Sequence, residues 1–456
     1  TASGAAWCWG NNGNGQLGSE IGSQALSPIA VGGTLPTVTP TATRVAQPMP
    51  SEYASIAKGY AHTCGLSLSG TAWCWGDNAS GQIGDGTTTA SLSPVYVSGG
   101  KAFTALVAGS NHTCGLTATG AAWCWGANGS GQLGDGTTNG GASTVPVAVT
   151  GTKTFTTLVA GSGHTCGLTA TGAAWCWGSN SLGELGDGTQ AWKSTPVAVA
   201  GGRTFTTLTA GATHTCGLTL DGTGWCWGGN SNGQRGTPPN GQTLRVPSAV
   251  SGGKSFTSIG AGGNQTCAIA TDTSTWCWGD NAHGQLGDGT TTQSSVPVLV
   301  SGGKEFASVA VGDAHACGLT STGTAWCWGN NANGQVGDKT SATRKVPTSV
   351  RGHLSFSTLT AGGGATCGVT DIGGAWCWGY NSNGQLGDGT TTDRLAPTLV
   401  MGIPPLPAAT VTPVVAPSHY VALTAGKDHT CGLTSVGGAW CWGSNASGQL
   451  GDGTTT

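Results

Sequence analysis

The sequence predicts an all-β protein, a seven-bladed β-propeller with four-stranded blades that is flanked by partial propeller blades. Three observations lead to this prediction. The block Trp-Cys-Trp-Gly occurs nine times, at steps of 50 to 52 residues through the middle of the chain. Each complete repeat carries two cysteines ten positions apart, and the whole pattern nearly returns after seven units. Repeats of about 40–50 residues built from short strands are typical of propeller blades.

The repeat over residues 101–150 illustrates the four strands of one blade. The segments FTALVAG, HTCGLTA, AAWCWGA and VPVAV are short, rich in β-branched or aromatic residues, and bounded by Gly, Thr or Asn. No stretch has the 3.6-residue apolar period of a helix. We therefore expect four antiparallel strands in each repeat.

The cysteine spacing predicts a disulfide across a hairpin. If Cys64 faces Cys74, then Leu66 faces Ala72, and a three-residue loop ends in Gly70. Such a loop is favoured in hairpins because glycine supplies the left-handed conformation. Facing Cα atoms lie about 4.5–5.5 Å apart, which a disulfide can bridge. The predicted pairs are Cys64 with Cys74, Cys114 with Cys124, Cys166 with Cys176, Cys216 with Cys226, Cys267 with Cys277, Cys317 with Cys327, Cys367 with Cys377, and Cys431 with Cys441.

The same hairpin predicts how neighbouring blades pack. Successive side chains of a strand point to opposite faces, so Cys64 and Cys74 lie on one face and Trp73 and Trp75 on the other. Because blades stack face to face, we expect the tryptophan face of one blade to pack on the disulfide face of the next.

Composition limits where the protein works and what it binds. Charged residues are only 8% of the chain and the net charge is −3, so a basic surface for nucleic acid is not expected. No apolar run approaches the roughly 20 residues of a membrane span. Seventeen cysteines without C-x2-C spacing favour disulfides over zinc. Disulfides indicate an oxidising setting, and we predict an extracellular or cell-surface location.

The repeats closely resemble those of the regulator of chromosome condensation family, whose fold is a seven-bladed β-propeller. The residues that carry the resemblance are the loop Trp125–Thr137, the Val145-Pro146 pair, and the segment Ala108–Thr117. The resemblance covers nearly the whole chain and implies the fold. It says little of function, because the fold hosts exchange factors, light sensors, secreted inhibitors and bacterial surface proteins. The paired cysteines depart from the nuclear members and argue against an exchange-factor role in the nucleus.

A longer period predicts the domain organisation. Two steps are longer than the rest, 66 residues from Cys8 to Cys74 and 64 from Cys377 to Cys441, and both contain a Pro/Thr-rich insert. We therefore expect an extended, semi-rigid linker at each insert. The predicted organisation is 1–30 as the end of a preceding propeller, 31–50 as a linker, 51–400 as the propeller, 401–417 as a linker, and 418–456 as the first blade of a following propeller.

The terminal segments have a second interpretation, as assembly arms that complete a blade of a neighbouring subunit. Cys8 lacks a partner within this sequence under either interpretation. It would pair with an upstream cysteine of a longer chain, or form an intermolecular bond.

Several repeated motifs suggest sites, but each has a simpler structural explanation. The histidine before the first cysteine recurs around the ring and suggests metal, yet it is replaced at Gln265 and Ala365. The family resemblance implies that this histidine bonds the backbone. The segment 77–86 weakly resembles a calcium loop, but it lacks the alternating ligands and the closing Glu. Gly13–Gly18 matches G-x-G-x-x-G without any βαβ context. The tryptophans could form a light-absorbing cluster, as in the plant ultraviolet receptor of this family, but their alternation places them between blades.

Four residues break the repeat and are predicted contact points. Trp192 is the only tryptophan outside the repeated motif, and Lys193 follows it. Arg235 and Arg245 stand in a fourth-blade loop that departs from the usual GDGTTT. Exposed aromatic and arginine side chains are common at protein contacts.

The sequence favours a structural protein, a secreted bacterial filament or surface component made of tandem disulfide-stapled propellers. Its expected partners are further copies along the filament, with glycans where the Asn-x-Ser/Thr sequons or Thr-rich linkers are modified. The alternative is a secreted binding module, an adhesin or inhibitor that uses one rim, as in a β-lactamase inhibitor of the same fold. Neither interpretation needs a cofactor, and no catalytic motif is recognised, so we do not predict an enzyme.

Overall fold

The computed structural model describes residues 50, 52–138, 141–238 and 244–401, together with the backbone of five flanking strands. Contacts divide the chain into two units, Thr1–Pro48 and Met49–Thr456. No helix in the described part of the chain is long and apolar enough to cross a membrane.

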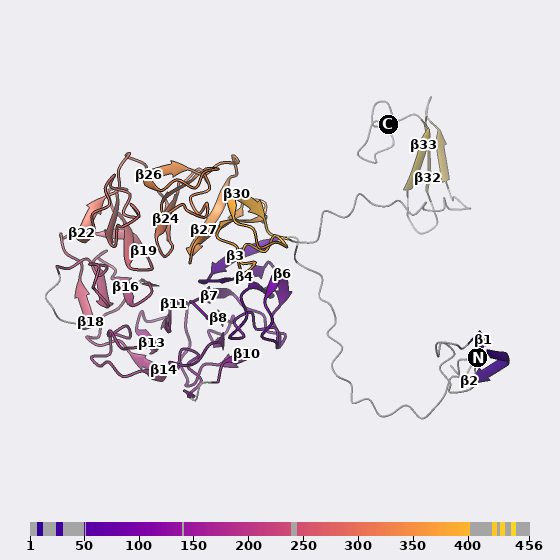
Figure 1. The fold of residues 1–456 in the computed structure, drawn as a ribbon, viewed down its shortest axis with the longest axis horizontal. Coiled ribbons are helices and arrows are strands. Elements are labelled where there is room, and N and C mark those ends of the chain that lie inside the picture. The colour runs from indigo at the N-terminus through magenta and orange to yellow at the C-terminus, as the bar shows by residue number, and fades with distance from the viewer. Residues whose placement is uncertain are drawn as a thin grey trace. The chain divides into compact units, whose positions relative to one another are not determined.

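Seven four-stranded antiparallel sheets form a ring, which confirms the predicted seven-bladed propeller (Figure 1). The first strand of each blade contacts the first strand of the next blade, so these strands surround the central channel. They are β3 (Tyr53–Lys58), β7 (Ala105–Ala108), β11 (Thr157–Ala160), β15 (Thr207–Ala210), β19 (Phe256–Gly262), β23 (Ser308–Val311) and β27 (Phe356–Gly362).

The second and third strands form the cysteine hairpin of each blade. The second strands are β4 (His62–Ser67), β8 (His112–Leu116), β12 (His164–Leu168), β16 (His214–Leu218), β20 (Gln265–Ala270), β24 (His315–Leu319) and β28 (Ala365–Thr370). The third strands are β5 (Ala72–Gly76), β9 (Ala122–Gly126), β13 (Ala174–Gly178), β17 (Gly224–Gly228), β21 (Thr275–Gly279), β25 (Ala325–Gly329) and β29 (Ala375–Gly379).

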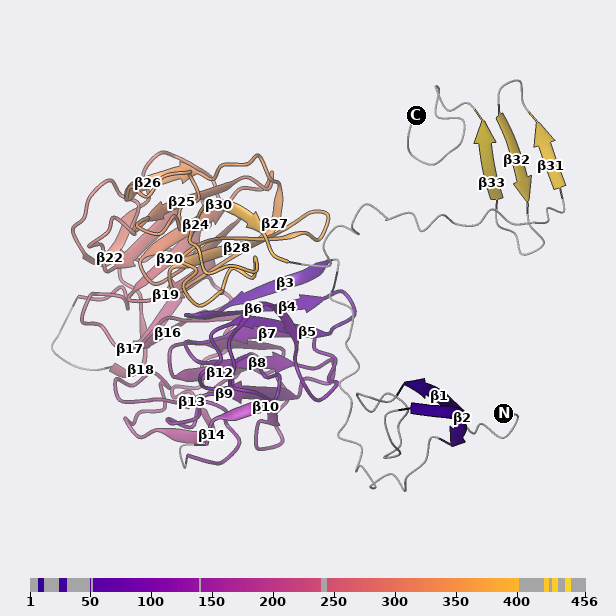
Figure 2. The same cartoon turned by 45° about the vertical axis from the view of Figure 1, so that its right-hand side comes forward.

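The fourth strand of each blade lies at the circumference of the ring (Figures 1 and 2). Each fourth strand contains a proline, and its pairing with the third strand is interrupted by a register shift. Proline and bulges on an edge strand block pairing with another sheet. These strands are β6 (Ser91–Tyr96), β10 (Ser143–Ala148), β14 (Lys193–Ala198), β18 (Leu244–Ala249), β22 (Ser294–Leu299), β26 (Arg344–Ser349) and β30 (Arg394–Leu399).

The register of the hairpin agrees with the pairing that the ten-residue cysteine spacing predicts. Cys64 faces Cys74, Leu66 faces Ala72, and Gly70 closes the loop with a φ of 82°. All seven predicted pairs within the ring are disulfides, with Cα atoms 4.0–4.1 Å apart and cysteines that are fully buried. The bonds join Cys64 with Cys74, Cys114 with Cys124, Cys166 with Cys176, Cys216 with Cys226, Cys267 with Cys277, Cys317 with Cys327, and Cys367 with Cys377.

The Cα separation is slightly shorter than the sequence analysis expected. Facing Cα atoms were expected at about 4.5–5.5 Å, whereas Cys114 and Cys124 lie 4.1 Å apart, and Cys267 and Cys277 lie 4.0 Å apart. The predicted pairing itself is unaffected.

The hydrophobic core lies between blades rather than inside them. Trp125 of the second blade is fully buried in one cluster with Cys64 and Cys74 of the first blade. Phe103 packs on the same indole, with ring centroids 5.8 Å apart. The predicted packing is confirmed for the second tryptophan of each motif. The first tryptophan lies on the same face but is only half-buried in six of the seven blades.

Strands of the repeat also occur outside the ring. β1 (Trp7–Asn11) pairs with β2 (Gln24–Ala30), and β31 (Ala422–Ala425), β32 (His429–Leu433) and β33 (Ala439–Gly443) form a three-stranded sheet. Cys431 faces Cys441 in register, as the spacing predicts. The side chains of these two cysteines and of Cys8 lie outside the described residues.

Thr273 takes the loop position that glycine holds in the other six blades, with a φ of 68°. A β-branched residue in this left-handed region costs about 1–2 kcal/mol. We expect Thr273→Gly to raise the free energy of unfolding by about 1 kcal/mol, because relief of strain exceeds the entropic cost of glycine. Chemical denaturation with disulfides intact measures the change. Thr322→Gly, in the sixth-blade loop where φ is not positive, is the matched control and should destabilise slightly.

Candidate functional site

A single backbone carbonyl joins each blade to the next. Thr113 Oγ1 and Trp125 Nε1 of the second blade both donate to the carbonyl of Gln82 in the first blade, at 2.9 and 3.0 Å. The loop that carries this carbonyl descends between the blades, where Ile83 is fully buried. The ring closes by the same chemistry, since Thr63 and Trp75 donate to the carbonyl of Gln385 in the seventh blade, at 2.7 and 3.0 Å.

The recurring histidines form a second set of contacts between blades. His62 Nε2 lies 2.8 Å from Thr113 Oγ1, and the same pair recurs at four further junctions. The imidazole Nε2 thus contacts a threonine hydroxyl of the next blade. Nε2 of each of these five imidazoles is therefore used in a contact with the next blade. No cluster of three potential metal ligands is found within the described residues.

Glycines surround one mouth of the central channel, between the first and second strand of every blade. A side chain on Gly59 would come within 2.6 Å of the carbonyl of Gly109, and one on Gly161 within 2.5 Å of the carbonyl of Gly211. Each glycine thus packs directly on the next blade. The channel mouth is a shallow hollow lined mainly by glycine, alanine and serine.

One basic and one acidic side chain line this hollow, Lys58 of the first blade and Asp313 of the sixth. Lys58 is buried, and its Nζ donates to the carbonyls of Gly59, Tyr60 and His62 at 2.8, 3.4 and 3.3 Å. Burial lowers the pKa of Lys58 to about 7, and the nearby charge of Asp313 opposes part of that shift. Burial also raises the pKa of Asp313. The ammonium form can donate to all three carbonyls, whereas a neutral amine has two N–H donors and can hold only two of them.

Lys58 supplies hydrogen bonds that a residue of the preceding blade makes at another junction. At the junction of blades five and six, Gln265 stands in place of the histidine, and its Nε2 donates to the carbonyl of His315, 2.8 Å away. The same amide nitrogen lies 3.4 Å from the carbonyl of Gly312. At the closing junction this position is Ala365, which has no donor. Lys58 bonds the equivalent carbonyls from within its own blade. The other blades have alanine or valine where Lys58 stands.

The structure places the four predicted contact residues differently. Arg235 is only 1% exposed, and it donates to the carbonyl of Gly228 at 3.2 Å. The prediction that Arg235 is a surface contact was wrong, because it occupies the repeat position that is a buried leucine or isoleucine in neighbouring blades. Trp192 is 54% exposed. Lys193 is half-exposed and pairs with Asp187 at 3.9 Å.

The fourth residue, Arg245, is exposed on the strand β18 that borders the Trp192 loop. Its backbone carbonyl accepts a bond from Gly188, which precedes that loop, at 2.9 Å. Trp192 and Arg245 therefore stand on neighbouring stretches of chain, one in the third blade and one at the start of β18. Arg235 is not part of this region.

The acidic Asn/Gly loops serve as turns. Asn78 is fully buried; its amide nitrogen donates to the carbonyls of Thr87 and Thr89, and its oxygen accepts from the Ile83 backbone. These bonds hold the segment that weakly resembles a calcium loop. Asn78 is also a sequon residue, and its buried amide is not accessible to a glycan in the folded ring, whereas the sequon residue Asn111 is exposed.

A row of cation–aromatic pairs was missed by the sequence analysis. Lys101 Nζ lies 3.5 Å from the ring centre of Trp123, and equivalent pairs occur in the next four blades. The signal was present, since a lysine or arginine stands two positions before the phenylalanine in those five repeats. In these five blades a cationic side chain therefore lies over the half-buried ring of the first tryptophan.

The fold and its junctions define a class of protein, the β-propellers built from tandem repeats of about 50 residues. A family profile described as the RCC1-like domain matches residues 97–416, and profiles of the regulator of chromosome condensation (RCC1) repeat match 53–82, 420–449 and 69–116. The chain therefore belongs to the RCC1-like repeat family.

Solved structures with the same fold are distant in sequence. Prp20p from Saccharomyces cerevisiae is 21% identical, with a TM-score of 0.68 over 74% of this chain and 87% of that chain. Human WBSCR16 is 20% identical, with a TM-score of 0.64 over 78% of this chain and 96% of that chain. At these identities the similarity shows the fold alone.

The closing junction can be tested by rebuilding it as the junction of blades five and six. We expect Lys58→Val to lower the free energy of unfolding by roughly 2–4 kcal/mol, because buried carbonyls lose their donor. Adding Ala365→Gln should recover at least half of the loss, since Gln265 makes the same bonds beside Val311. Denaturation of both variants measures this. Ala365→Gln on its own is the control. Equal stability of Lys58→Val and of the double variant would contradict the role assigned to Lys58.

The buried histidines predict acid sensitivity. Burial lowers the pKa of His164 to about 4 from an ordinary 6.5. The unfolded chain therefore binds more protons between these values, and stability falls as pH drops from about 6.5 to 4. We expect His164→Gln to reduce the loss of unfolding free energy between pH 7 and 4 by on the order of 3 kcal/mol. Denaturant unfolding at both pH values provides the comparison. The control is the same substitution at an exposed histidine outside the blade junctions, His353→Gln.

Proposed function

We propose that this protein is a structural component of an extracellular bacterial filament or surface appendage made of tandem disulfide-stapled propellers. The observation that carries the proposal is the self-sufficiency of the ring. Seven blades already close on themselves through the carbonyl of Gln385, yet strands of the same repeat lie before and after them in the chain. In this proposal those strands belong to further units, and the chain is organised as a series of propellers.

The chemistry of the ring suits exposure outside a cell. Disulfides in every blade are typical of oxidising compartments. Each is buried between blades, so a reductant reaches it only after the blades separate. The chain has only 16 lysine and arginine residues, which leaves few sites for trypsin-like proteases.

The fourth strands at the circumference of the ring favour end-to-end assembly over lateral association through sheet edges. A proline interrupts every fourth strand, so the exposed edges are poor templates for pairing with another sheet. Connections between units then come from the predicted Pro-rich linkers.

A secreted binding module is the second candidate, favoured by the exposed indole of Trp192. Large exposed aromatics are unusual unless they contact something. Prp20p, a protein of the same fold, is described by its binding to Gsp1p and histones. A binding role for this chain would place the contact at the Trp192 loop and Arg245.

The mass and appearance of the native polypeptide test the proposal. We expect reduced, denatured native material to have a mass far above 44.8 kDa, and electron microscopy to show ring-shaped beads at regular spacing. Isolated, monodisperse propellers would contradict the filament. A saturable complex with a soluble protein or glycan that Trp192→Ala weakens would instead favour the binding module.

A further inference from the structure

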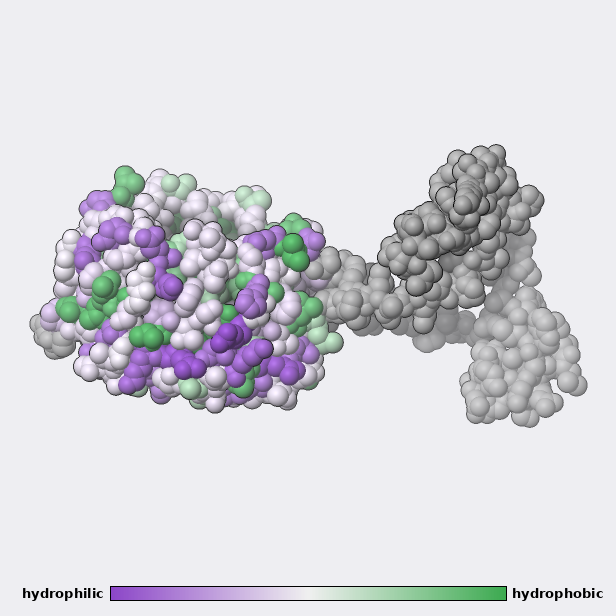
Figure 3. Space-filling model, turned by 90° about the horizontal axis from the view of Figure 1, so that it is seen from above, coloured by the Kyte–Doolittle hydropathy of each residue, from purple (hydrophilic) through white to green (hydrophobic). Residues whose placement is uncertain are grey.

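The hairpin loop between the second and third strands of the fourth blade departs from the repeat. Its tip is Leu220-Asp221, whereas the second and third blades have Ala118-Thr119 and Ala170-Thr171 at these positions. Leu220 is 91% exposed. The loop lies on the side of the ring that carries the hairpin loops of all seven blades, which we call the hairpin face. It is thus separate from the circumference, where hydrophobic groups are scattered among polar ones (Figure 3).

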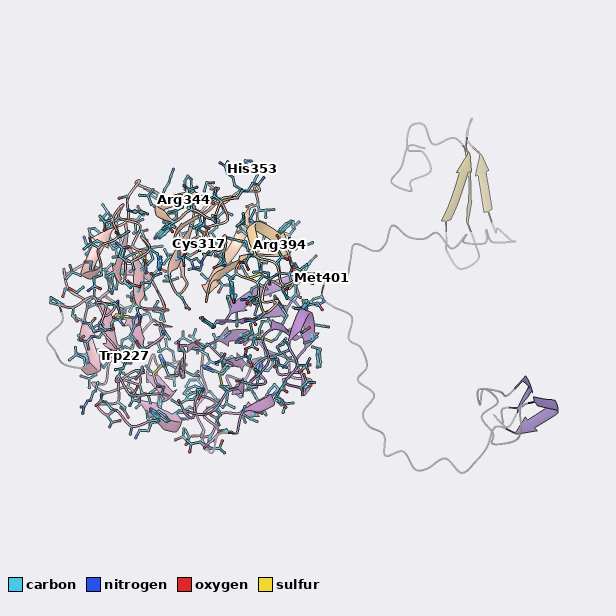
Figure 4. All side chains as sticks on the ribbon, in the orientation of Figure 1. Trp227, Cys317, Arg344, His353, Arg394 and Met401 are labelled. Atoms are coloured by element: carbon cyan, nitrogen blue, oxygen red, sulfur yellow. A yellow bond between two sulfur atoms is a disulfide. The ribbon has the colours of Figure 1, made fainter. Side chains whose placement is uncertain are left out.

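Leu220 and Asp221 line a shallow hollow together with Arg203 and Trp225. Arg203 lies over the Trp225 ring, with its guanidinium carbon 3.7 Å from the ring centre. Trp225 belongs to β17, whose buried second tryptophan, Trp227, is labelled in Figure 4. Five blades have such a cation–indole pair, and among them only the fourth has a leucine at the tip of its hairpin loop.

An indole N–H at this hollow has no partner among the described residues. In the fifth blade, the equivalent Trp276 Nε1 donates to Ser274 Oγ at 2.7 Å. The corresponding hydroxyl of the fourth blade, Thr223 Oγ1, donates to Asp221 at 3.0 Å but is not reached by Trp225 Nε1. A buried donor without a partner is costly, so Trp225 Nε1 gains free energy from an acceptor that a ligand supplies.

The hollow contains two opposite charges that do not pair with each other. Asp221 accepts from Thr219 Oγ1 at 2.6 Å, and from the Thr223 nitrogen and Oγ1 at 3.1 and 3.0 Å. These bonds lower the pKa of Asp221 and keep it ionised. The ion pairs of the described residues do not include one between Arg203 and Asp221. The hollow therefore offers N–H donors to an anionic group and a carboxylate to hydroxyl groups.

Two lysines continue the positive charge of Arg203 along the hairpin face. Lys153 of the third blade and Lys101 of the second hold the same repeat position, and each lies over its own tryptophan. The hairpin loops and connections of these two blades contain no acidic residue. On the other side of the hollow, Asp272 and Glu305 interrupt the positive charge. A bound polyanion should therefore extend from the fourth blade toward the second.

We propose that the hairpin face of blades two to four binds an acidic polysaccharide, with one uronic-acid unit in the fourth-blade hollow. The Arg203 guanidinium and the Trp225 N–H receive the carboxylate of this unit. Asp221 accepts from its hydroxyl groups, and Leu220 covers the apolar C–H face of the sugar ring. The two lysines hold carboxylates of the following units.

The surroundings of the hollow favour a sugar over an acidic peptide. The adjacent strands β16 and β17 are paired on both sides, so no strand edge is open to a peptide backbone. The remaining lining is small and polar, with Thr204 and Thr219 among it. The proposal does not depend on the tandem organisation, since the hollow lies within one blade.

The test is calorimetric titration of the oxidised, full-length chain with a hexamer of galacturonic acid at low ionic strength. Arg203→Lys/Leu220→Ala/Asp221→Thr gives the fourth blade the side chains of the third, so the fold should persist. We expect this variant to bind at least about five-fold more weakly than the native chain, because the forked donor, the apolar cover and the acceptor are lost together.

The seventh-blade loop provides a matched control. Asp371→Ala/Ile372→Thr makes the same kind of change in a blade that has Leu354 in place of the cation, and it should bind like the native chain. Trp192→Ala should also bind like the native chain, so this site is distinguished from a contact at the Trp192 loop.

Four results would overturn the proposal. The native chain might bind no hexamer, or the triple variant might bind it as tightly as the native chain. Equal affinity for the methyl-esterified hexamer would exclude recognition of the carboxylate. Equal or tighter binding of hexaglutamate would assign the face to an acidic peptide instead.

Discussion

The shared carbonyl between blades is the interaction on which the ring depends. It receives a tryptophan N–H and, at six of the seven junctions, a threonine hydroxyl, and it fixes the distance and rotation from one blade to the next. Both donors are buried, so loss of either leaves a polar group unpaired in an apolar junction. The disulfide, the leucine at the hairpin and the phenylalanine then pack around the indole that this bond has positioned. The glycines at the channel mouth are a consequence, because blades held at this spacing leave no room for a Cβ.

The sequence predicts what is local and misses what joins distant positions. The hairpin register follows from a spacing of ten residues and a glycine, and the opposite faces follow from alternation along a strand. The partner of His62 is some 50 residues away, and nothing in the spacing identifies Thr113. Arg235 was wrongly predicted as a contact residue because the prediction followed its charge. Its position in the repeat is a core position. The sequence analysis did not identify Lys58 as important. Its role depends on Ala365, which has no hydrogen-bond donor and lies in a blade that becomes its neighbour only when the ring closes.

Departures from the repeat are therefore the informative residues of this protein. Most blades are near copies, and their shared features explain the fold rather than the function. The closing junction has a substituted donor at the channel, and the third blade adds an exposed tryptophan. Uniform blades suit a scaffold, whereas a binding protein would be expected to vary its rim more widely.

The position of the two chain connections determines how the ring responds to a pull. Tension that enters before β3 and leaves after β30 crosses the ring by its shortest route, through the junction of the seventh and first blades. The other six junctions form a longer path in parallel and share what remains. Mechanical failure should therefore start beside Lys58, and the ring would open into a curved strip of blades whose hairpins are still locked. An array of such rings would lengthen in discrete steps while every disulfide stays intact.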